Sequence, residues 1–249
     1  MKELLKEIRK KLEQKTDEKK VKSFQHFFKE KIISLGVKAK DVEIISKEYY
    51  KKYFKDKTKN EIFEFCEYLF QSEYFEENII ACRFIIFCSN FYEKKDIYIF
   101  ERWIDSYVNN WAVCDTFCNH AVGEFLEKYP ESIENLKLWS KSENLWKRRA
   151  SAVSLIIPAR KGLFFKEILE IAENLLLDKE DLVQKAYGWM LKAASLSETF
   201  VKIDEKIKKE HLENVYNFLL KHKSVMPRTS LRYAIEKMPD ELRKVIMTR

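Results

Sequence analysis

Residues 111–128 read WAVCDTFCNHAVGEFLEK, and this stretch decides the fold class. At about 100° per residue, its apolar side chains fall on one stripe of an α-helix. The stripe comprises Cys114, Phe117, Cys118, Ala121, Val122 and Phe125. Trp111 lies on the same stripe, and Asp115 borders it one turn later. Because a helical period recurs along nearly the whole chain, the sequence predicts an all-α protein.

Glycine and proline are scarce throughout the chain. The 249 residues include 4 Gly and 4 Pro, about 3% of the chain against roughly 12% in average usage. This scarcity nearly excludes a turn-rich all-β protein. A composition of 46% hydrophobic and 35% charged residues is too apolar for a disordered chain and too polar for a membrane protein.

The sequence also indicates the compartment. No run approaches the roughly 18 apolar residues that a membrane span needs, and the N-terminus alternates charges instead of opening an apolar signal segment. We therefore expect a cytoplasmic protein that binds no membrane. The five cysteines lie in apolar surroundings, which favours buried reduced thiols over disulfides. They are Cys66, Cys82, Cys88, Cys114 and Cys118.

Apolar periodicity and capping signals predict the helix boundaries. Thr58 and Ser140 each begin a capping-box pattern, and Asn110, Asp178 and Ser197 are further predicted starts. The predicted helices span residues 2–14, 19–35, 41–54, 60–70, 74–89, 95–107, 111–128, 131–139, 143–158, 163–176, 180–194, 198–208, 211–222, 228–237 and 240–247. Helix pairs recurring every ~35–40 residues favour a solenoid of stacked antiparallel pairs over a compact bundle.

Charge is distributed unevenly along the chain. Residues 61–80 carry six acids and no base, whereas residues 141–166 carry seven bases and one acid. The last 49 residues carry 12 bases and 7 acids. Such a positive C-terminal half could attract a polyanion such as nucleic acid, or it could be a set of solvated helix faces.

Arg149 and Trp189 do not fit the simple division into apolar and polar helix faces. Arg149 lies inside the apolar stripe of the helix beginning near Asn144, while Arg148 points away from that stripe. An Arg in an apolar stripe needs an anionic partner or must line a groove, because burying it unpaired is unfavourable. Trp189 lies at the edge of another stripe between Lys185 and Lys192. This arrangement suits a sugar-phosphate backbone, or a Trp packed under lysine stems.

The sequence offers no pattern for metal or cofactor chemistry. Cys114, Cys118 and His120 mimic a metal cluster, but both cysteines lie on the core stripe and no second pair has ligand spacing. A glycine-rich phosphate loop and a nucleophile elbow are also missing from the sequence. We expect no metal and no cofactor.

Four motifs together resemble the DNA alkylation repair enzyme family, the AlkD-like alkylpurine DNA glycosylases. They are residues 111–115 (WAVCD), 145–150 (LWKRRA), 181–189 (DLVQKAYGW) and 226–237 (MPRTSLRYAIEK). The first hundred residues resemble the family only in helical pattern. The resemblance implies one domain over residues 1–249, a right-handed superhelical solenoid of HEAT-like antiparallel helix pairs with a concave basic face. It implies a monomer whose partner is double-stranded DNA containing alkylated purines.

The resemblance also assigns roles to residues. Asp115 takes the place of the catalytic aspartate, Trp111 and Trp189 those of the active-site tryptophans, and Arg149 that of the groove arginine. Arg148, Lys185 and Lys192 are further predicted DNA contacts, with Lys192 standing where many relatives have Arg. The implied reaction is monofunctional excision of N3- or N7-alkylated purines. The alternative is a non-catalytic HEAT-repeat module that binds DNA or an acidic protein, or a protein-interaction scaffold.

Overall fold

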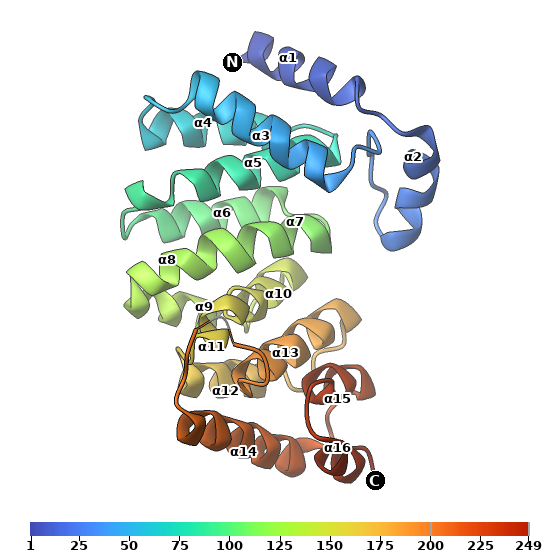
Figure 1. Cartoon of the computed structure of the whole chain (residues 1–249), viewed down its shortest axis with the longest axis vertical. Coiled ribbons are helices and arrows are strands. Elements are labelled where there is room, and N and C mark those ends of the chain that lie inside the picture. The colour runs from blue at the N-terminus through green and yellow to red at the C-terminus, as the bar shows by residue number, and fades with distance from the viewer. Residues whose placement is uncertain (200, 249) are drawn as a thin grey trace. The chain divides into compact units, whose positions relative to one another are not determined.

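The computed structural model describes residues 1–199 and 201–248 and confirms the all-α prediction. Within these residues no strand forms, apart from a single bridge between Ile33 and Tyr74. The α-helices, labelled in Figure 1, are α1 (Lys2–Glu13), α2 (Glu18–Phe24), α3 (Ala39–Tyr53), α4 (Lys59–Phe70), α5 (Phe75–Phe87), α6 (Asp96–Tyr107), α7 (Trp111–Thr116), α8 (Gly123–Lys128), α9 (Ile133–Trp139), α10 (Leu145–Val153), α11 (Ile156–Arg160), α12 (Phe165–Asn174), α13 (Asp181–Ala194), α14 (Glu205–His222), α15 (Arg228–Ile235) and α16 (Asp240–Met247).

The chain divides into two compact units. The first unit contains residues 1–96 and 106–117, and the second contains residues 97–105 and 118–249. In the first unit α5 packs against α3, α4 and α7. In the second unit α13 packs against α10, α11, α12 and α15. The single solenoid domain stays a prediction.

The apolar residues singled out by the sequence form the core. The whole stripe of residues 114–125 is fully buried, as are the five cysteines, which are all free. Burial raises the pKa of the Cys66 and Cys82 thiols. The prediction of buried reduced thiols is therefore confirmed.

Two of the predicted helix starts are confirmed in detail. Thr58 Oγ1 accepts a hydrogen bond from Glu61 N at 3.3 Å, and Glu61 Oε2 accepts one from Thr58 N at 2.9 Å, which completes the capping box. Hydrogen bonds from Lys57 and Thr58 lower the pKa of Glu61 to about 2. Asn110 caps α7, since its Oδ1 accepts from Val113 N at 3.0 Å.

The predicted starts at Ser140, Asp178 and Ser197 are wrong, whereas the start near Asn144 is confirmed. The helix after Ser140 begins at Leu145, where Asn144 Oδ1 accepts from Trp146 N at 2.8 Å. Asp178 precedes α13 by more than one residue, because Glu180 occupies the N-cap position. Ser197 does not begin the next helix either, as Asp204 caps α14.

Four predicted helix ranges also need correction. In the predicted range 19–35 the helix gives way to a 3-10 turn that ends at Phe27. The Gln25 side chain there donates a hydrogen bond to the Glu30 carbonyl oxygen. The range 143–158 is interrupted at residues 154–155, because Pro158 lacks an N–H and its ring would clash with the carbonyl four residues earlier. Residues 205–222 form one helix where two were expected, since no helix-breaking residue lies at 209–210. The predicted range 198–208 includes residue 200, outside the described residues.

Candidate functional site

The predicted site residues of the first unit share one short helix. Trp111 opens α7 directly after its Asn110 cap, and Asp115 follows one turn later on the same face. Both side chains are partly exposed, whereas Val113 and Cys114 between them are buried. α7 therefore presents an indole and a carboxylate together at the border of the core.

The Trp111 ring is fixed by a segment outside the four motifs. Its Nε1 donates a hydrogen bond to the Phe27 carbonyl oxygen at 3.0 Å. Its ring stacks on Phe28, with centroids 5.4 Å apart and planes 17° apart. Phe28 in turn packs against Phe24 and Phe75. Sequence reasoning missed this segment, although three phenylalanines among lysines within residues 19–31 were a signal for it.

The helix changes character directly after Asp115. Residues 117–122 form a π-helical section between α7 and α8. Such sections are rare and occur frequently at functional sites. The change of helical pitch lies one or two residues after the carboxylate, which adds a structural reason to consider α7 functional.

Arg149 of the second unit is a buried arginine. Its side chain lies on α10, the residue is 5% exposed, and its Nη1 donates to the Leu182 carbonyl oxygen in the first turn of α13. The sequence left open whether this arginine has a buried partner or lines a groove. The structure shows that it ties α10 to α13.

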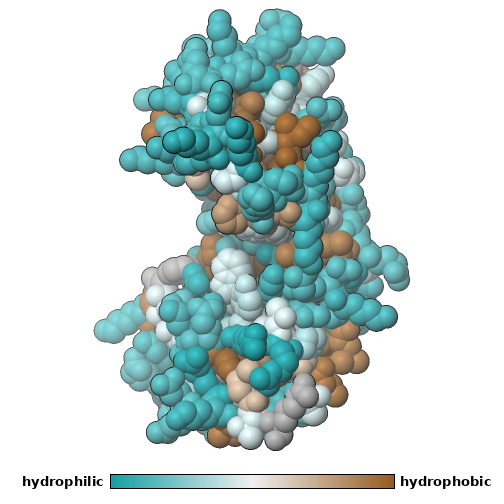
Figure 2. All heavy atoms as spheres, turned by 90° about the vertical axis from the view of Figure 1, so that its right-hand side faces the viewer, coloured by the Kyte–Doolittle hydropathy of each residue, from teal (hydrophilic) through white to brown (hydrophobic). Residues whose placement is uncertain are grey.

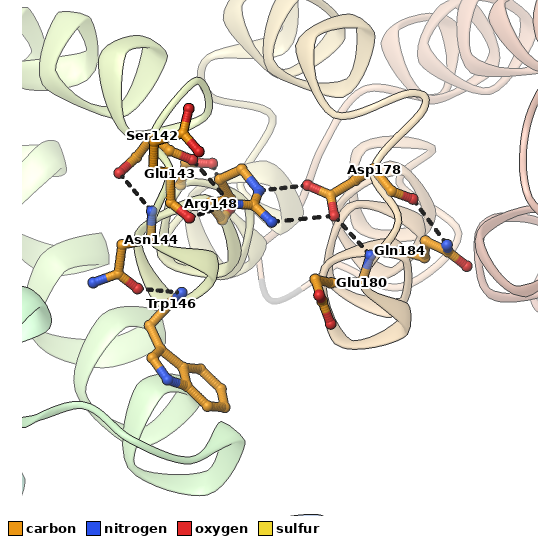
Figure 3. A network of polar contacts seen from close by, with 9 residues as sticks. Ser142, Glu143, Asn144, Trp146, Arg148, Asp178, Glu180 and Gln184 are labelled. Atoms are coloured by element: carbon orange, nitrogen blue, oxygen red, sulfur yellow. Dashed lines mark hydrogen bonds and ion pairs between the residues drawn. The ribbon is translucent and has the colours of Figure 1, made fainter.

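Arg148 belongs to a network within the protein (Figure 3). Its Nε donates to Asp178 Oδ2 at 2.6 Å, and its Nη1 donates to the carbonyl oxygens of Ser142 and Glu143, each at 2.9 Å. Asp178 also accepts from Glu180 N at 2.9 Å. The network joins the turn before α10 to the turn before α13, so packing alone accounts for Arg148.

The lysines beside Trp189 are ion-paired. Lys185 Nζ lies 3.1 Å from Asp181 Oδ2 on the same helix. Lys192 Nζ lies 2.8 Å from Glu236 Oε2, and only 13% of the Lys192 side chain is exposed. Trp189 itself is partly exposed. The predicted aromatic between two lysines is thus present on α13, with both lysines engaged by carboxylates.

Gly188 of the motif 181–189 packs against the motif 226–237, which gives a structural reason for the two motifs to occur together. A Cβ at this position would lie 2.6 Å from the Ser230 carbonyl oxygen and 2.7 Å from Tyr233 Cβ. α13 and α15 lie side by side at this point (Figure 1), and only glycine permits so close an approach. The neighbouring Tyr187 hydroxyl contacts Ser230 Oγ at 2.7 Å, and burial raises the Tyr187 pKa to about 12.

The described residues show no further chemistry-bearing cluster. Across residues 1–199 and 201–248, no group of three His, Cys, Asp or Glu side chains could hold a metal ion. None of the helices in that part of the chain is long and apolar enough to cross a membrane. Figure 2 shows a face covered largely by hydrophilic side chains, with apolar side chains exposed in separate small patches.

One comparison with known proteins shows the family of this chain. The family model described as DNA alkylation repair enzyme matches residues 8–238. The structure superimposes on a predicted DNA alkylation repair enzyme from Enterococcus faecalis with a TM-score of 0.74 at 15% identity, covering 91% of this chain and 98% of that one. This likeness concerns the fold alone.

Superposition on smu.31 from Streptococcus mutans UA159 gives a TM-score of 0.48 at 24% identity, covering 72% of this chain and 96% of that chain. No curated protein matches the chain.

Proposed function

The chain belongs to the DNA alkylation repair enzyme family, and from this premise we propose that it is a monofunctional alkylpurine DNA glycosylase. Its substrate is duplex DNA that carries a cationic N3- or N7-alkylated purine. The reaction is hydrolysis of the N-glycosidic bond, which opens base excision repair. The family match supports the DNA repair role, and the arrangement on α7 supports the reaction type.

One observation carries the proposal: a partly exposed carboxylate and a partly exposed indole lie one turn apart on α7. An alkylated cationic purine departs as a neutral base, so no general acid has to protonate it. Glycoside hydrolysis of poor leaving groups uses two carboxylates, and here one is enough. Asp115 stabilises the positive charge that develops on the deoxyribose and orients the attacking water.

The aromatic residues act on the same developing charge. The Trp111 and Trp189 rings pack against the deoxyribose of the lesion nucleotide and add cation–π stabilisation as the sugar becomes cationic. The hydrogen bond and stacking that fix the Trp111 ring support this role, because a preorganised ring needs no reordering during the reaction.

The second unit supplies the hold on DNA in this proposal. Lys185 of α13 is the proposed phosphate contact, because its pair with Asp181 is partly exposed and weak. Arg149 of α10 is buried and bonded to the Leu182 carbonyl oxygen, so its proposed part is to hold α13 in position toward the DNA. We propose that both units form a HEAT-like solenoid, that its concave basic face holds the duplex, and that the protein acts as a monomer.

The test is release of 7-methylguanine from methylated duplex DNA by wild type and by Asp115→Asn. We expect at least a ~100-fold slower single-turnover rate for Asp115→Asn, because one preorganised charge is lost at the reacting sugar. DNA affinity should be equal or higher, since a carboxylate facing phosphates is removed. Near-normal release by Asp115→Asn would contradict the assignment of Asp115.

A matched control makes the result specific. Asp56→Asn removes an equal charge from an exposed position of the first unit, and its release rate should equal that of wild type. A wild-type protein that binds DNA with steep salt dependence and releases no base would instead favour the non-catalytic DNA-binding module.

A further inference from the structure

The segment of residues 18–31 presents an aromatic ring among positive charges. It contains α2 and the 3-10 turn Gln25–Phe27, with five lysines against two glutamates. Phe27 is 70% exposed, and no other large hydrophobic side chain among the described residues is more exposed. Lys19, Lys22 and Lys31 are exposed as well. A ring interleaved with lysines matches the chemistry of a nucleic acid, with base faces for the ring and phosphates for the ammonium groups.

The turn that carries Phe27 is held by specific side-chain contacts. Gln25 Nε2 donates to the carbonyl oxygens of Phe28 at 3.3 Å and Glu30 at 2.7 Å, and Gln25 Oε1 accepts from Ile32 N at 3.0 Å. One glutamine side chain therefore closes the loop that follows the ring. The exposure of Phe27 is a property of a built turn.

The loop is anchored again a few residues later. The buried Glu76 carboxylate accepts from Ser34 Oγ at 2.7 Å, Leu35 N at 3.0 Å and Val37 N at 3.2 Å. Phe75 N donates to the Ile33 carbonyl oxygen at 2.9 Å. The chain that follows the turn is thus fixed to the body of the first unit.

The same turn is bonded to the candidate site. The Phe27 carbonyl oxygen accepts the Trp111 indole N–H, and the next ring, Phe28, stacks on that indole. Phe28 is partly buried and orients Trp111, while Phe27 remains exposed. The exposed Phe27 ring is therefore carried by a turn whose backbone is bonded to the Trp111 indole.

We propose that Phe27 is a DNA-contacting residue whose ring stacks on a nucleobase next to the lesion, with the lysines of residues 19–31 meeting the flanking phosphates. The inference rests on the proposed function for its substrate. Base–aromatic stacking changes affinity by about 5- to 150-fold per base, and its sequence tolerance suits a repair enzyme that meets lesions in any context.

The experiment compares Phe27→Ala, Phe27→Trp and a control, Phe91→Ala. Phe91 is an exposed phenylalanine of the first unit, at 59%, on the 3-10 turn Ser89–Phe91. The probe is a duplex with a tetrahydrofuran abasic site and 2-aminopurine beside it. Anisotropy gives the dissociation constant, and 2-aminopurine fluorescence reports stacking. Release of 7-methylguanine is measured in parallel on methylated duplex.

We expect Phe27→Ala to weaken binding about tenfold and to lose the fluorescence change, with an unchanged melting temperature because the ring is exposed. Phe27→Trp should restore both signals, and Phe91→Ala should equal wild type. Unchanged binding by Phe27→Ala overturns the proposal and assigns the ring to a protein partner instead. Equal defects in Phe27→Ala and Phe27→Trp also overturn it, since they would reflect a disturbed turn and not lost stacking.

The outcomes separate this inference from the proposed function. A wild-type protein that releases base normally while Phe27→Ala binds and acts like wild type refutes the role of Phe27 alone. A wild-type protein whose DNA binding depends on Phe27 but which releases no base refutes the glycosylase alone.

Discussion

Helices α7 and α13 carry the two predicted tryptophans, and they differ in how their polar residues are used. On α7 the indole of Trp111 and the carboxylate of Asp115 are partly exposed, and the indole is fixed from outside by a loop. On α13 the lysines beside Trp189 are paired with carboxylates. The first helix exposes part of an indole and part of a carboxylate, and the second combines a partly exposed ring with lysines that are ion-paired within the unit.

The difference teaches that a family motif can contain residues that serve packing as well as residues proposed to act on the substrate. Gly188 belongs to the third motif because α15 approaches its backbone, and Arg148 belongs to the second because it joins two turns. Neither requires DNA to explain it. Asp115 differs from both in being partly exposed at the border of the core.

The largest expected effect on stability comes from Gly188→Ala. The added Cβ would lie 2.6 Å from the Ser230 carbonyl oxygen, which is backbone and cannot rotate away. We expect the free energy of unfolding to fall by about 1–3 kcal/mol, although Ala favours the helix by up to ~1 kcal/mol. Urea denaturation measures the change.

Gly123→Ala is the matched control in the same unit. Its nearest backbone atom, the Ser154 carbonyl oxygen, lies at 3.0 Å, and the next contact at 3.6 Å. We expect a change of less than about 1 kcal/mol, since the helix gain offsets a small adjustment. If Gly188→Ala proves as stable as Gly123→Ala but binds DNA poorly, the packing explanation of the third motif is wrong.

The sequence predicted the features that depend on residues a few positions apart, and it missed the contacts between residues that are far apart in the chain. The all-α class, the buried stripe after Cys114 and the caps at Thr58 and Asn110 follow from residues a few positions apart. Arg148 and Asp178 are 30 positions apart, and nothing in the sequence pairs them. These contacts form only when helices pack.

The candidate site shows the same division. Helical spacing alone placed Trp111 and Asp115 on neighbouring turns of one face. The partner of Trp111 could not be predicted, because Gln25 breaks the expected helix by taking backbone hydrogen bonds that its continuation would need. The periodicity of residues 19–35 favours a helix, but the hydrogen bonds of the Gln25 side chain stabilise a turn instead.

Arg148→Met and Lys185→Met divide structural from DNA-binding basic residues. Arg148→Met leaves a mostly buried Asp178 carboxylate, whose side chain is 6% exposed, without its ion pair. We expect a loss of about 2 kcal/mol in unfolding free energy, against ~0.5 kcal/mol or less for the exposed pair of Lys185. Urea denaturation measures both.

The salt dependence of DNA binding gives the complementary result. Lys185→Met should lower the slope of log affinity against log salt by about 0.9, which corresponds to one phosphate contact. Arg148→Met should leave the slope unchanged, because its guanidinium is occupied inside the protein. A lowered slope for Arg148→Met with unchanged stability would contradict this prediction and would identify Arg148 as a phosphate contact instead of a structural residue.

The last comparison concerns two matched helix caps. Asn110 caps α7 and Asn144 caps α10, each through its side-chain oxygen. Replacing either by Ala should lower the unfolding free energy by about 1 kcal/mol. Their effects on base release should differ, because α7 carries Asp115 and α10 carries no residue of the proposed chemistry.

Asn110→Ala is expected to slow single-turnover release about tenfold, since a displaced carboxylate loses its position at the sugar, while Asn144→Ala should release base at the wild-type rate. Measuring both variants at a temperature where each is fully folded removes the shared stability loss, so an equal slowing in the two would show that α7 has no special role in the chemistry.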